Sequence, residues 1–308
     1  MLIKTQYSRY RFKVQTLRSS DARILIIGLG QIGYSNAEYM TSLGLKVDGY
    51  DISDKAVKRA LDNNLIRRAA ITFEGYDYYI VCVSTHDPSN MSLPSYNGLL
   101  STAYRLSVEG KRGALVTVES TVTRGMSHKI EEILGHRLHV AHVPHRFYAD
   151  EKIEHGVRQT RVLGGCNNCC TKRALHLYQD LLKIPVHTVR SIQLAELSKI
   201  IENSHRFIEI AFAEELKMLC DAYSLDFAEL RDAVNSKWNV KILEPRKGIG
   251  GHCLPKDSQM YVDLTKRVLA SSVVGSAKAV DEYYRAGLTQ EKDTCVIVQP
   301  RLLSLATS

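Results

Sequence analysis

A glycine-rich turn between two apolar strands constrains this chain more than any other feature. Arg23–Ile27 is a short run rich in β-branched residues, as in a buried parallel strand. It leads directly into Gly28–Gly33 (GLGQIG), and a helical pattern follows to about Leu43. A second strand, Lys46–Tyr50, ends at Asp51. This order of strand, turn, helix and strand is the setting in which a G-x-G-x-x-G motif binds a dinucleotide.

Each residue of the turn has an expected part in cofactor binding. Gly28 makes the tight turn, Gly30 lets the backbone approach a pyrophosphate, and Gly33 lets the helix pack on the strand. Gln31 and Ile32 open the helix, where free N–H groups and the helix dipole favour an anion.

The acid that follows the second strand indicates which dinucleotide is bound. Asp51 is expected to accept hydrogen bonds from the ribose hydroxyls and to repel a 2′-phosphate. The predicted cofactor is therefore NAD rather than NADP. The alternative is an α/β turn that binds no nucleotide.

Further strand-like runs alternate with helical spacers, and they are Tyr78–Val83, Gly113–Val118, Leu138–Val143 and Arg161–Gly165. This alternation predicts an α/β fold with an N-terminal Rossmann-type, doubly wound parallel sheet. Functional groups in such sheets follow the carboxyl ends of the strands, so Thr85, Thr121 and His145 are expected to face one crevice. Ser84 and Glu119, in the same loops, are further predicted cofactor contacts. Each of these residues has an alternative role as a loop cap or turn former.

The second half of the chain is dominated by one long helical pattern. Ser191–Tyr223 contains no Pro or Gly and would form about 50 Å of helix, too long for one small domain to cover. We therefore expect it to support a second, mainly helical domain and a homodimer. Lys199 and Asn203 are four residues apart, so they lie on one helix face and can point at one ligand. The alternative is a solvated polar stripe that continues to Arg206.

The stretch Gly248–Asp257 (GIGGHCLPKD) contains the clearest candidate for covalent chemistry. Its glycines permit close approach of the backbone to a ligand, and Lys256 lies near the thiol of Cys253. A neighbouring cation or a helix N-terminus lowers a thiol pKa and so favours the nucleophilic thiolate. The alternative is that Cys253 is a small buried apolar residue. A last helical segment is predicted near Gln259–Arg285.

A chain of 308 residues is long enough for two domains. We expect a basic, flexible extension over residues 1–20, an NAD-binding Rossmann domain over 21–190, a helical central and dimerisation domain with the cysteine loop over 191–290, and a tail over 291–308.

Composition excludes several classes of function. The net charge is +8, but the basic residues are interleaved with acids and accompany no nucleic-acid-binding motif. An anionic small-molecule substrate explains the charge equally well. No apolar run reaches the roughly 20 residues of a membrane span, and residues 1–20 lack the apolar core of a secretory signal. The seven scattered cysteines favour a reducing, cytoplasmic location.

The cysteine cluster Cys166-Asn167-Asn168-Cys169-Cys170 is half of a metal-binding pattern without a matching second pair. His155 and His176 could complete it on paper, but zinc needs four ligands at defined distances. We expect no metal, and interpret these small residues as the opening of a helix.

In this order the motifs resemble those of the UDP-glucose/GDP-mannose dehydrogenase family. Members oxidise the C6 alcohol of a nucleotide sugar to a carboxylate with two NAD molecules, through a cysteine-bound thiohemiacetal and thioester. The matching stretches are Gly28–Gly33, Glu119-Ser120-Thr121-Val122, Arg161–Gly165, Ala195-Glu196-Leu197-Ser198-Lys199 with Asn203, and Gly248–Asp257. The form Gly-Gly-His-Cys is associated with the branch that acts on UDP-N-acetylhexosamines, which function in polysaccharide biosynthesis.

The resemblance implies a role for each matching residue. Cys253 would be the nucleophile, Lys199 and Asn203 would stabilise the oxyanion, and Thr121 and Asp257 would position and activate water. His145 stands where the family has a glutamate after proline, and a histidine can act as a general base near neutral pH.

The resemblance also leaves alternatives open. The family has a third, C-terminal domain that holds the nucleotide, and this chain is about a hundred residues too short to contain it. We expect a separate chain to complete the site, a smaller substrate, or a truncated relic. The competing functions are a two-electron NAD-dependent alcohol or hydroxyacid dehydrogenase and a non-catalytic, dimeric NAD-binding paralogue.

Overall fold

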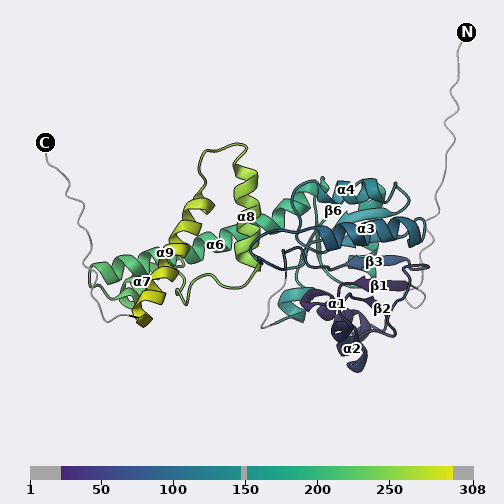
Figure 1. The fold of residues 1–308 in the computed structure, drawn as a ribbon, viewed down its shortest axis with the longest axis horizontal. Coiled ribbons are helices and arrows are strands. Elements are labelled where there is room, and N and C mark those ends of the chain that lie inside the picture. The colour runs from purple at the N-terminus through teal and green to yellow at the C-terminus, as the bar shows by residue number, and fades with distance from the viewer. Residues whose placement is uncertain (1–21, 147–150, 294–308) are drawn as a thin grey trace, which may run out of the picture.

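The computed structural model describes residues 22–146 and 151–293. The predicted extension over residues 1–20 and most of the predicted tail lie outside these ranges. Figure 1 shows the described part as a sheet flanked by helices, continued by a long helix that carries a smaller group of helices at its far end.

A seven-stranded sheet forms the first part of the chain. Its strands are β1 (Arg23–Ile27), β2 (Lys46–Tyr50), β3 (Tyr78–Val81), β4 (Leu115–Val118), β5 (His139–His142), β6 (Arg161–Gly165) and β7 (Val186–Thr188). They lie in the order β2-β1-β3-β4-β5-β6-β7. The first five run parallel, as predicted, whereas β6 pairs antiparallel with β5 through Ala141 and Gly165. The predicted doubly wound parallel sheet is confirmed, and the pairing of β6 with β5 is its one departure among the described strands.

The helices on the sheet are α1 (Gln31–Ser42), α2 (Asp54–Asp62), α3 (Asn97–Glu109), α4 (Met126–Ile133), α5 (Asn168–Leu175) and the π-helical turns η1 (Ile153–Val157) and η2 (His176–Leu181). Those of the second part are α6 (Ile192–Ala222), α7 (Phe227–Asn235), α8 (Cys253–Thr265) and α9 (Val273–Asp293).

Alternate side chains of each strand enter opposite cores. Ile24 and Ile26 of β1 pack with Met40 and Tyr178 on one face, and Leu25 and Ile27 pack with residues of α3 and α4 on the other. The sheet is therefore buried on both sides, which explains why its strands are continuous apolar runs.

The long predicted helix is confirmed as α6, which packs against both α8 and α9. A small core of Phe207, Ala211, Ile249 and Ala277 holds these helices together. The single helix predicted near Gln259–Arg285 is wrong, because the chain forms α8 and α9 separately. The hydroxyl of Ser272 accepts from the backbone N–H of Gly275 at 3.0 Å, and this capping contact starts α9.

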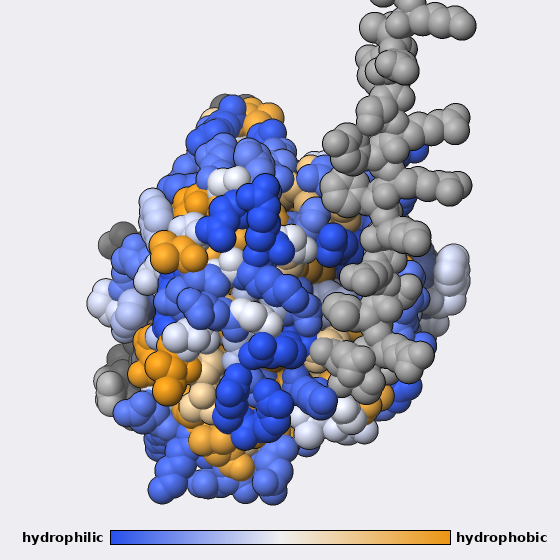
Figure 2. Space-filling view, turned by 90° about the vertical axis from the view of Figure 1, so that its right-hand side faces the viewer, coloured by the Kyte–Doolittle hydropathy of each residue, from blue (hydrophilic) through white to orange (hydrophobic). Residues whose placement is uncertain are grey.

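The end of the molecule formed by the sheet carries hydrophobic residues in separate groups among hydrophilic ones (Figure 2). Within residues 22–146 and 151–293, no helix has both the length and the apolar character that a membrane span requires.

The glycine-rich turn is shaped by two close backbone approaches. Gly28 has φ 93°, and a Cβ there would lie 2.7 Å from the carbonyl oxygen of Cys82. A Cβ on Gly33 would lie 1.8 Å from the carbonyl oxygen of Gly28. Gly30 has open space around it and is exposed. Packing therefore requires glycine at the first and third positions, whereas the second position is free to face a ligand.

This difference predicts opposite behaviour of two alanine variants. Gly33→Ala should lower the free energy of unfolding by about 1–3 kcal/mol, since the added methyl meets fixed backbone. Gly30→Ala should change it by less than about 0.5 kcal/mol and weaken NAD binding instead. Urea unfolding followed by circular dichroism measures both, and a Gly33→Ala chain as stable as the native one would contradict the packing argument.

Candidate active site

The site forms where the loops after three neighbouring strands meet α6 and α8. Since β3, β4 and β5 are parallel neighbours, their carboxyl ends lie at one edge of the sheet. The hydroxyl of Thr85, after β3, donates to the backbone carbonyl of Thr121, after β4, at 2.8 Å. The backbone N–H of His145, after β5, donates to the carbonyl of Glu119 at 3.2 Å. The structure thus brings together the three loops that the sequence predicts to face one crevice.

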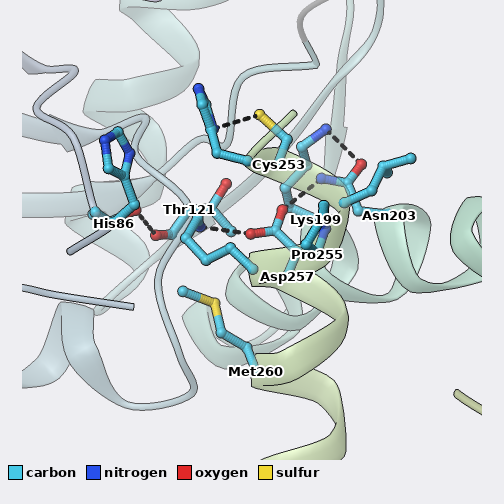
Figure 3. A network of polar contacts seen from close by, with 12 residues as sticks. His86, Thr121, Lys199, Asn203, Cys253, Pro255, Asp257 and Met260 are labelled. Carbon is cyan, nitrogen blue, oxygen red and sulfur yellow. Dashed lines mark hydrogen bonds and ion pairs between the residues drawn. The ribbon is translucent and has the colours of Figure 1, made fainter. Parts of the chain in front are cut away.

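Asp257 lies at the centre of the polar network in Figure 3. Its carboxylate accepts hydrogen bonds from the side-chain amide of Asn203 on α6 and from the ammonium of Lys256 at 2.6 Å. Lys199 in turn donates to the amide oxygen of Asn203 at 3.2 Å. One turn of α6 and the first turn of α8 are therefore joined in one chain of hydrogen bonds. Sequence reasoning identified Asp257, Asn203 and Lys199 but gave Lys256 no part in this network.

Cys253 is the first residue of α8 and its side chain is exposed. Its Sγ lies 3.2 Å from Nδ1 of His252. The prediction that nearby cations lower the thiol pKa is only partly met. Partial burial, followed by the charge of Asp257, raises this pKa, while Lys256 and Lys199 act in the opposite direction. The net direction in the unliganded chain is upward, so a thiolate here needs a further base or cation.

A pair of imidazoles lies beside this thiol, and sequence reasoning did not assign them a role. The rings of His86 and His252 stack with centroids 4.9 Å apart. Ser84 Oγ lies 2.8 Å from Nδ1 of His86. Burial, His86 and Lys256 lower the pKa of His252, which favours its neutral form. A neutral imidazole in contact with a thiol can accept its proton.

His145 is buried, and two cations lie close enough to act on its charge. Burial, Arg161 and Lys199 together hold its pKa well below its usual value. Burial likewise lowers the pKa of Lys199. Both shifts favour the neutral, proton-accepting form of the group over its charged form.

The predicted cofactor turn has the expected local geometry. Asp51 Oδ2 accepts from the backbone N–H of Leu29 at 2.6 Å and Oδ1 from that of Ser53 at 2.8 Å, so the carboxylate is fixed beside the turn. Gln31 and Ser84 are exposed, as residues that contact a cofactor would be. The side chain of Ile32 is half-buried.

Glu119 differs from the other predicted cofactor contacts, because its side chain is buried. It accepts hydrogen bonds from Asn36 at 2.9 Å, from Tyr178 at 2.6 Å and from Arg161 at 3.3 Å. These bonds join α1, β4, η2 and β6. Its carboxylate is thus engaged in holding the sheet to its helices, and direct contact with a cofactor stays a prediction.

Two buried acids position the segments around the cysteine. Glu196 of α6 is not part of a solvated stripe. Its carboxylate accepts from the backbone N–H groups of Gly125 at 2.6 Å and Ser127 at 2.7 Å, at the start of α4. Asp281 of α9 accepts from the N–H of Ile249 at 2.7 Å and so anchors the glycine-rich segment before Cys253.

The run Cys166–Cys170 opens a helix, in agreement with our interpretation. Asn167 caps α5 by accepting from the backbone N–H of Cys170 at 3.0 Å. Cys169 is exposed, and the sulfur of Cys170 lies 3.5 Å from Nδ1 of His139. Among the described residues, a grouping with metal-ligand geometry contains Cys166 but neither of the other two cysteines.

Comparison with known proteins first establishes the class. Residues 23–141 match the NAD binding domain of 6-phosphogluconate dehydrogenase. The prediction of an NAD-binding, Rossmann-type domain is therefore confirmed.

The next segment matches the family that the motifs resemble. Residues 193–283 match the central domain of the UDP-glucose/GDP-mannose dehydrogenase family. This match agrees with the resemblance that the motifs carry.

Named relatives agree with this match. The UDP-N-acetyl-D-mannosamine dehydrogenase of Methanococcus maripaludis is 29% identical over 266 residues, which is 79% of this chain and 62% of that protein. The enzyme of the same name from Pyrococcus horikoshii is 29% identical over 273 residues, 79% of this chain and 65% of that protein. A solved structure, the UDP-D-ManNAc dehydrogenase of P. horikoshii, superposes with a TM-score of 0.75 at 27% identity and covers 87% of this chain and 71% of that one. The chain thus spans 62% and 65% of the length of these two curated relatives.

The electrostatics of Cys253 predict how its alkylation responds to Lys199. Lys199→Gln removes a cation that lowers the thiol pKa, so the thiolate fraction at pH 8 and the iodoacetamide rate should fall by about 3–10-fold. Mass spectrometry of Cys253 against pH measures this, with exposed Cys169 as the internal reference. Lys217→Gln, on the same helix, is the matched control. An unchanged pH profile in Lys199→Gln would show that this charge does not reach the thiol.

Proposed function

We propose that the chain takes part in NAD-dependent oxidation of the C6 alcohol of a nucleotide sugar of the UDP class to the carboxylate. The observation that carries this proposal is the hydrogen-bonded set of Lys199, Asn203 and Asp257, with the thiol of Cys253 close enough for the charges of Lys199 and Asp257 to act on it. A two-electron alcohol dehydrogenase needs a base and an oxyanion partner. It has no use for a nucleophilic cysteine at the same place.

The residues of the turn would hold NAD, whose oxidised nicotinamide supplies the hydride acceptor. Gly30 and the N–H groups that open α1 would face the pyrophosphate, and Asp51 would accept from the ribose. Lys199, with its lowered pKa, accepts the proton of the C6 hydroxyl as the hydride leaves.

Cys253 then captures the aldehyde. Its thiol passes a proton to His252, 3.2 Å away, and the sulfur adds to the aldehyde carbon to give a thiohemiacetal. The oxyanion that forms is stabilised by Lys199 and Asn203, which are already joined by a hydrogen bond. Transfer of a second hydride to a second molecule of NAD would give a thioester.

Hydrolysis of the thioester requires a base for water. His145, held neutral by burial and by two cations, can accept the proton, while Asp257 and Thr121 orient the water. The products are the carboxylate and the free thiol of Cys253. A histidine thus serves where the resemblance implies a glutamate.

The proposal predicts two NADH per sugar consumed. The chain should be assayed with UDP-N-acetylhexosamines, UDP-glucose and GDP-mannose, with NADH counted by absorbance and the sugar product by mass spectrometry. His145→Gln should keep two NADH per sugar but reduce the reaction to a single burst of two NADH per active site, because the thioester then forms without being hydrolysed.

Two variants separate the alternatives. Cys253→Ala should stop carboxylate formation. If it leaves full alcohol oxidation at one NADH per sugar, the two-electron dehydrogenase is correct. If NAD binds and the native chain turns over no sugar of the panel, the non-catalytic paralogue or a requirement for a second chain is favoured.

We also propose a homodimer formed through α6. Large apolar side chains lie exposed along this helix at Leu194, Ile201, Phe212 and Leu219. Their spacings of seven, eleven and seven residues place them on one face. In Figure 1 the end of α6 extends well beyond the sheet, so much of this stripe is available to a second copy.

A charge in the middle of the stripe should disrupt the dimer. Phe212→Glu is expected to give a monomer by size-exclusion chromatography with light scattering, with an unchanged circular dichroism spectrum. Arg206→Glu, exposed on another face of α6, is the control. A native chain that is monomeric at assay concentrations would contradict the proposal.

We place this function in a reducing compartment and propose the cytoplasm. The described cysteines are all free, including the two exposed ones, Cys169 and Cys253. Exposed thiols persist where thiol reductants keep them reduced.

A further inference from the structure

A second cluster of reactive side chains uses none of the residues around Cys253. His128 and Glu131 lie on α4, and Cys166 follows the last residue of β6. Because α4 is a helix, residues three apart lie on one face, so the imidazole and the carboxylate both face the same side. Their ligand atoms and the sulfur of Cys166 all lie within 4.8 Å of one another.

The distances are close to those of a metal centre. Nδ1 of His128 lies 3.4 Å from Oε2 of Glu131. Zinc binds nitrogen and oxygen at about 2.0–2.2 Å and sulfur at about 2.3 Å, which puts tetrahedral ligand atoms roughly 3.3–3.7 Å apart. The nitrogen and oxygen pair is already at this separation. The sulfur needs a movement of at most on the order of 1 Å, within reach of one side-chain rotation.

The charges around the sulfur favour a cation. The cluster supplies one carboxylate, on Glu131, and one thiol, on Cys166. A divalent cation would balance one carboxylate and one thiolate, and metal binding stabilises a deprotonated thiol outright.

The surroundings already orient the ligands. Nδ1 of His136 lies 3.7 Å from Oε1 of Glu131, so one oxygen is engaged and Oε2 faces His128. Such contacts to the outer oxygen of a ligand are typical of metal sites. Glu196 fixes the start of α4 through two backbone N–H groups, which sets the position of the helix. The side chain of His128 is 41% exposed, which gives an ion access.

We propose that His128, Glu131 and Cys166 form a zinc site, with water in the fourth position. One nitrogen, one oxygen and one sulfur ligand suit Zn²⁺, whereas Mg²⁺ and Ca²⁺ take oxygen ligands. The ion ties α4 to the turn between β6 and α5. It braces the part of the sheet from which α6 departs.

Cobalt substitution tests the site in the full 308-residue chain. After removal of metal with EDTA, one equivalent of Co²⁺ should produce a thiolate-to-cobalt charge-transfer absorption and visible bands of tetrahedral cobalt. Zn²⁺ should displace them. Cys166→Ser should abolish the charge-transfer band, whereas Cys169→Ser and Cys253→Ser should retain it. No band at one equivalent, or a band that survives Cys166→Ser, would overturn the proposal.

Substitutions of the other two ligands leave Cys166 in place and test the site even if Cys166→Ser does not fold. Glu131→Gln and His128→Ala should each weaken Zn²⁺ binding at least tenfold by calorimetry, since even outer contacts cost 10–100-fold. They should also abolish the rise in melting temperature that Zn²⁺ gives the native chain. Glu132→Gln, the exposed neighbour, should match the native chain. Native-like Zn²⁺ affinity in both ligand variants would also overturn the proposal.

Discussion

The buried carboxylate of Asp257 is the contact on which the geometry of the candidate site depends. Asp257 and Lys256 form an ion pair whose side chains are 1% and 5% exposed, and Asn203 donates to the same carboxylate. A buried charge left without its partner costs about 3–5 kcal/mol. Both members of the ion pair lie on α8, so the bond from Asn203 to Asp257 is the one that holds α8 against α6. Cys253, at the start of α8, is thereby placed beside Lys199 of α6. The contact that packs α8 against α6 therefore also positions the candidate nucleophile Cys253.

A second buried ion pair, formed by Glu119 and Arg161, lies in the sheet. Glu119 and Arg161 are both fully buried and lie 3.3 Å apart, and Tyr178 and Asn36 complete the bonds of the carboxylate. This network joins β4 to the antiparallel strand β6. Arg161 also acts on the adjacent His145, whose pKa it lowers. The ion pair of Glu119 and Arg161, which joins β4 to β6, therefore also helps to set the protonation of His145 in the site.

Local patterns in the sequence predict much of this structure. The apolar runs and the glycine turn predict β1 to α1 to β2, and the absence of Pro and Gly predicts α6, because both depend on near neighbours. The direction of β6 depends on which strand it pairs with, and no local pattern carries that information. The stacking of His86 on His252 and the grouping of His128 with Cys166 likewise join residues far apart in the chain. The contact between Lys199 and Asn203 follows from their spacing on one helix, whereas the long-range contact between Asn203 and Asp257 was predictable only through a family resemblance.

The histidine at position 145 changes the charge balance of the site. A glutamate there, as the resemblance implies, would neutralise part of the charge of Lys199 and Arg161. His145 adds no negative charge, and burial together with these same cations opposes its protonation. Lys199 then has its remaining partners in Glu202, Asp257 and Cys253, all of which raise its pKa against burial. The charge of Lys199 therefore depends on the thiol of Cys253 as well as on the carboxylates of Glu202 and Asp257. When Cys253 loses its proton, the resulting thiolate stabilises the charged form of Lys199. The charged Lys199 in turn stabilises the thiolate.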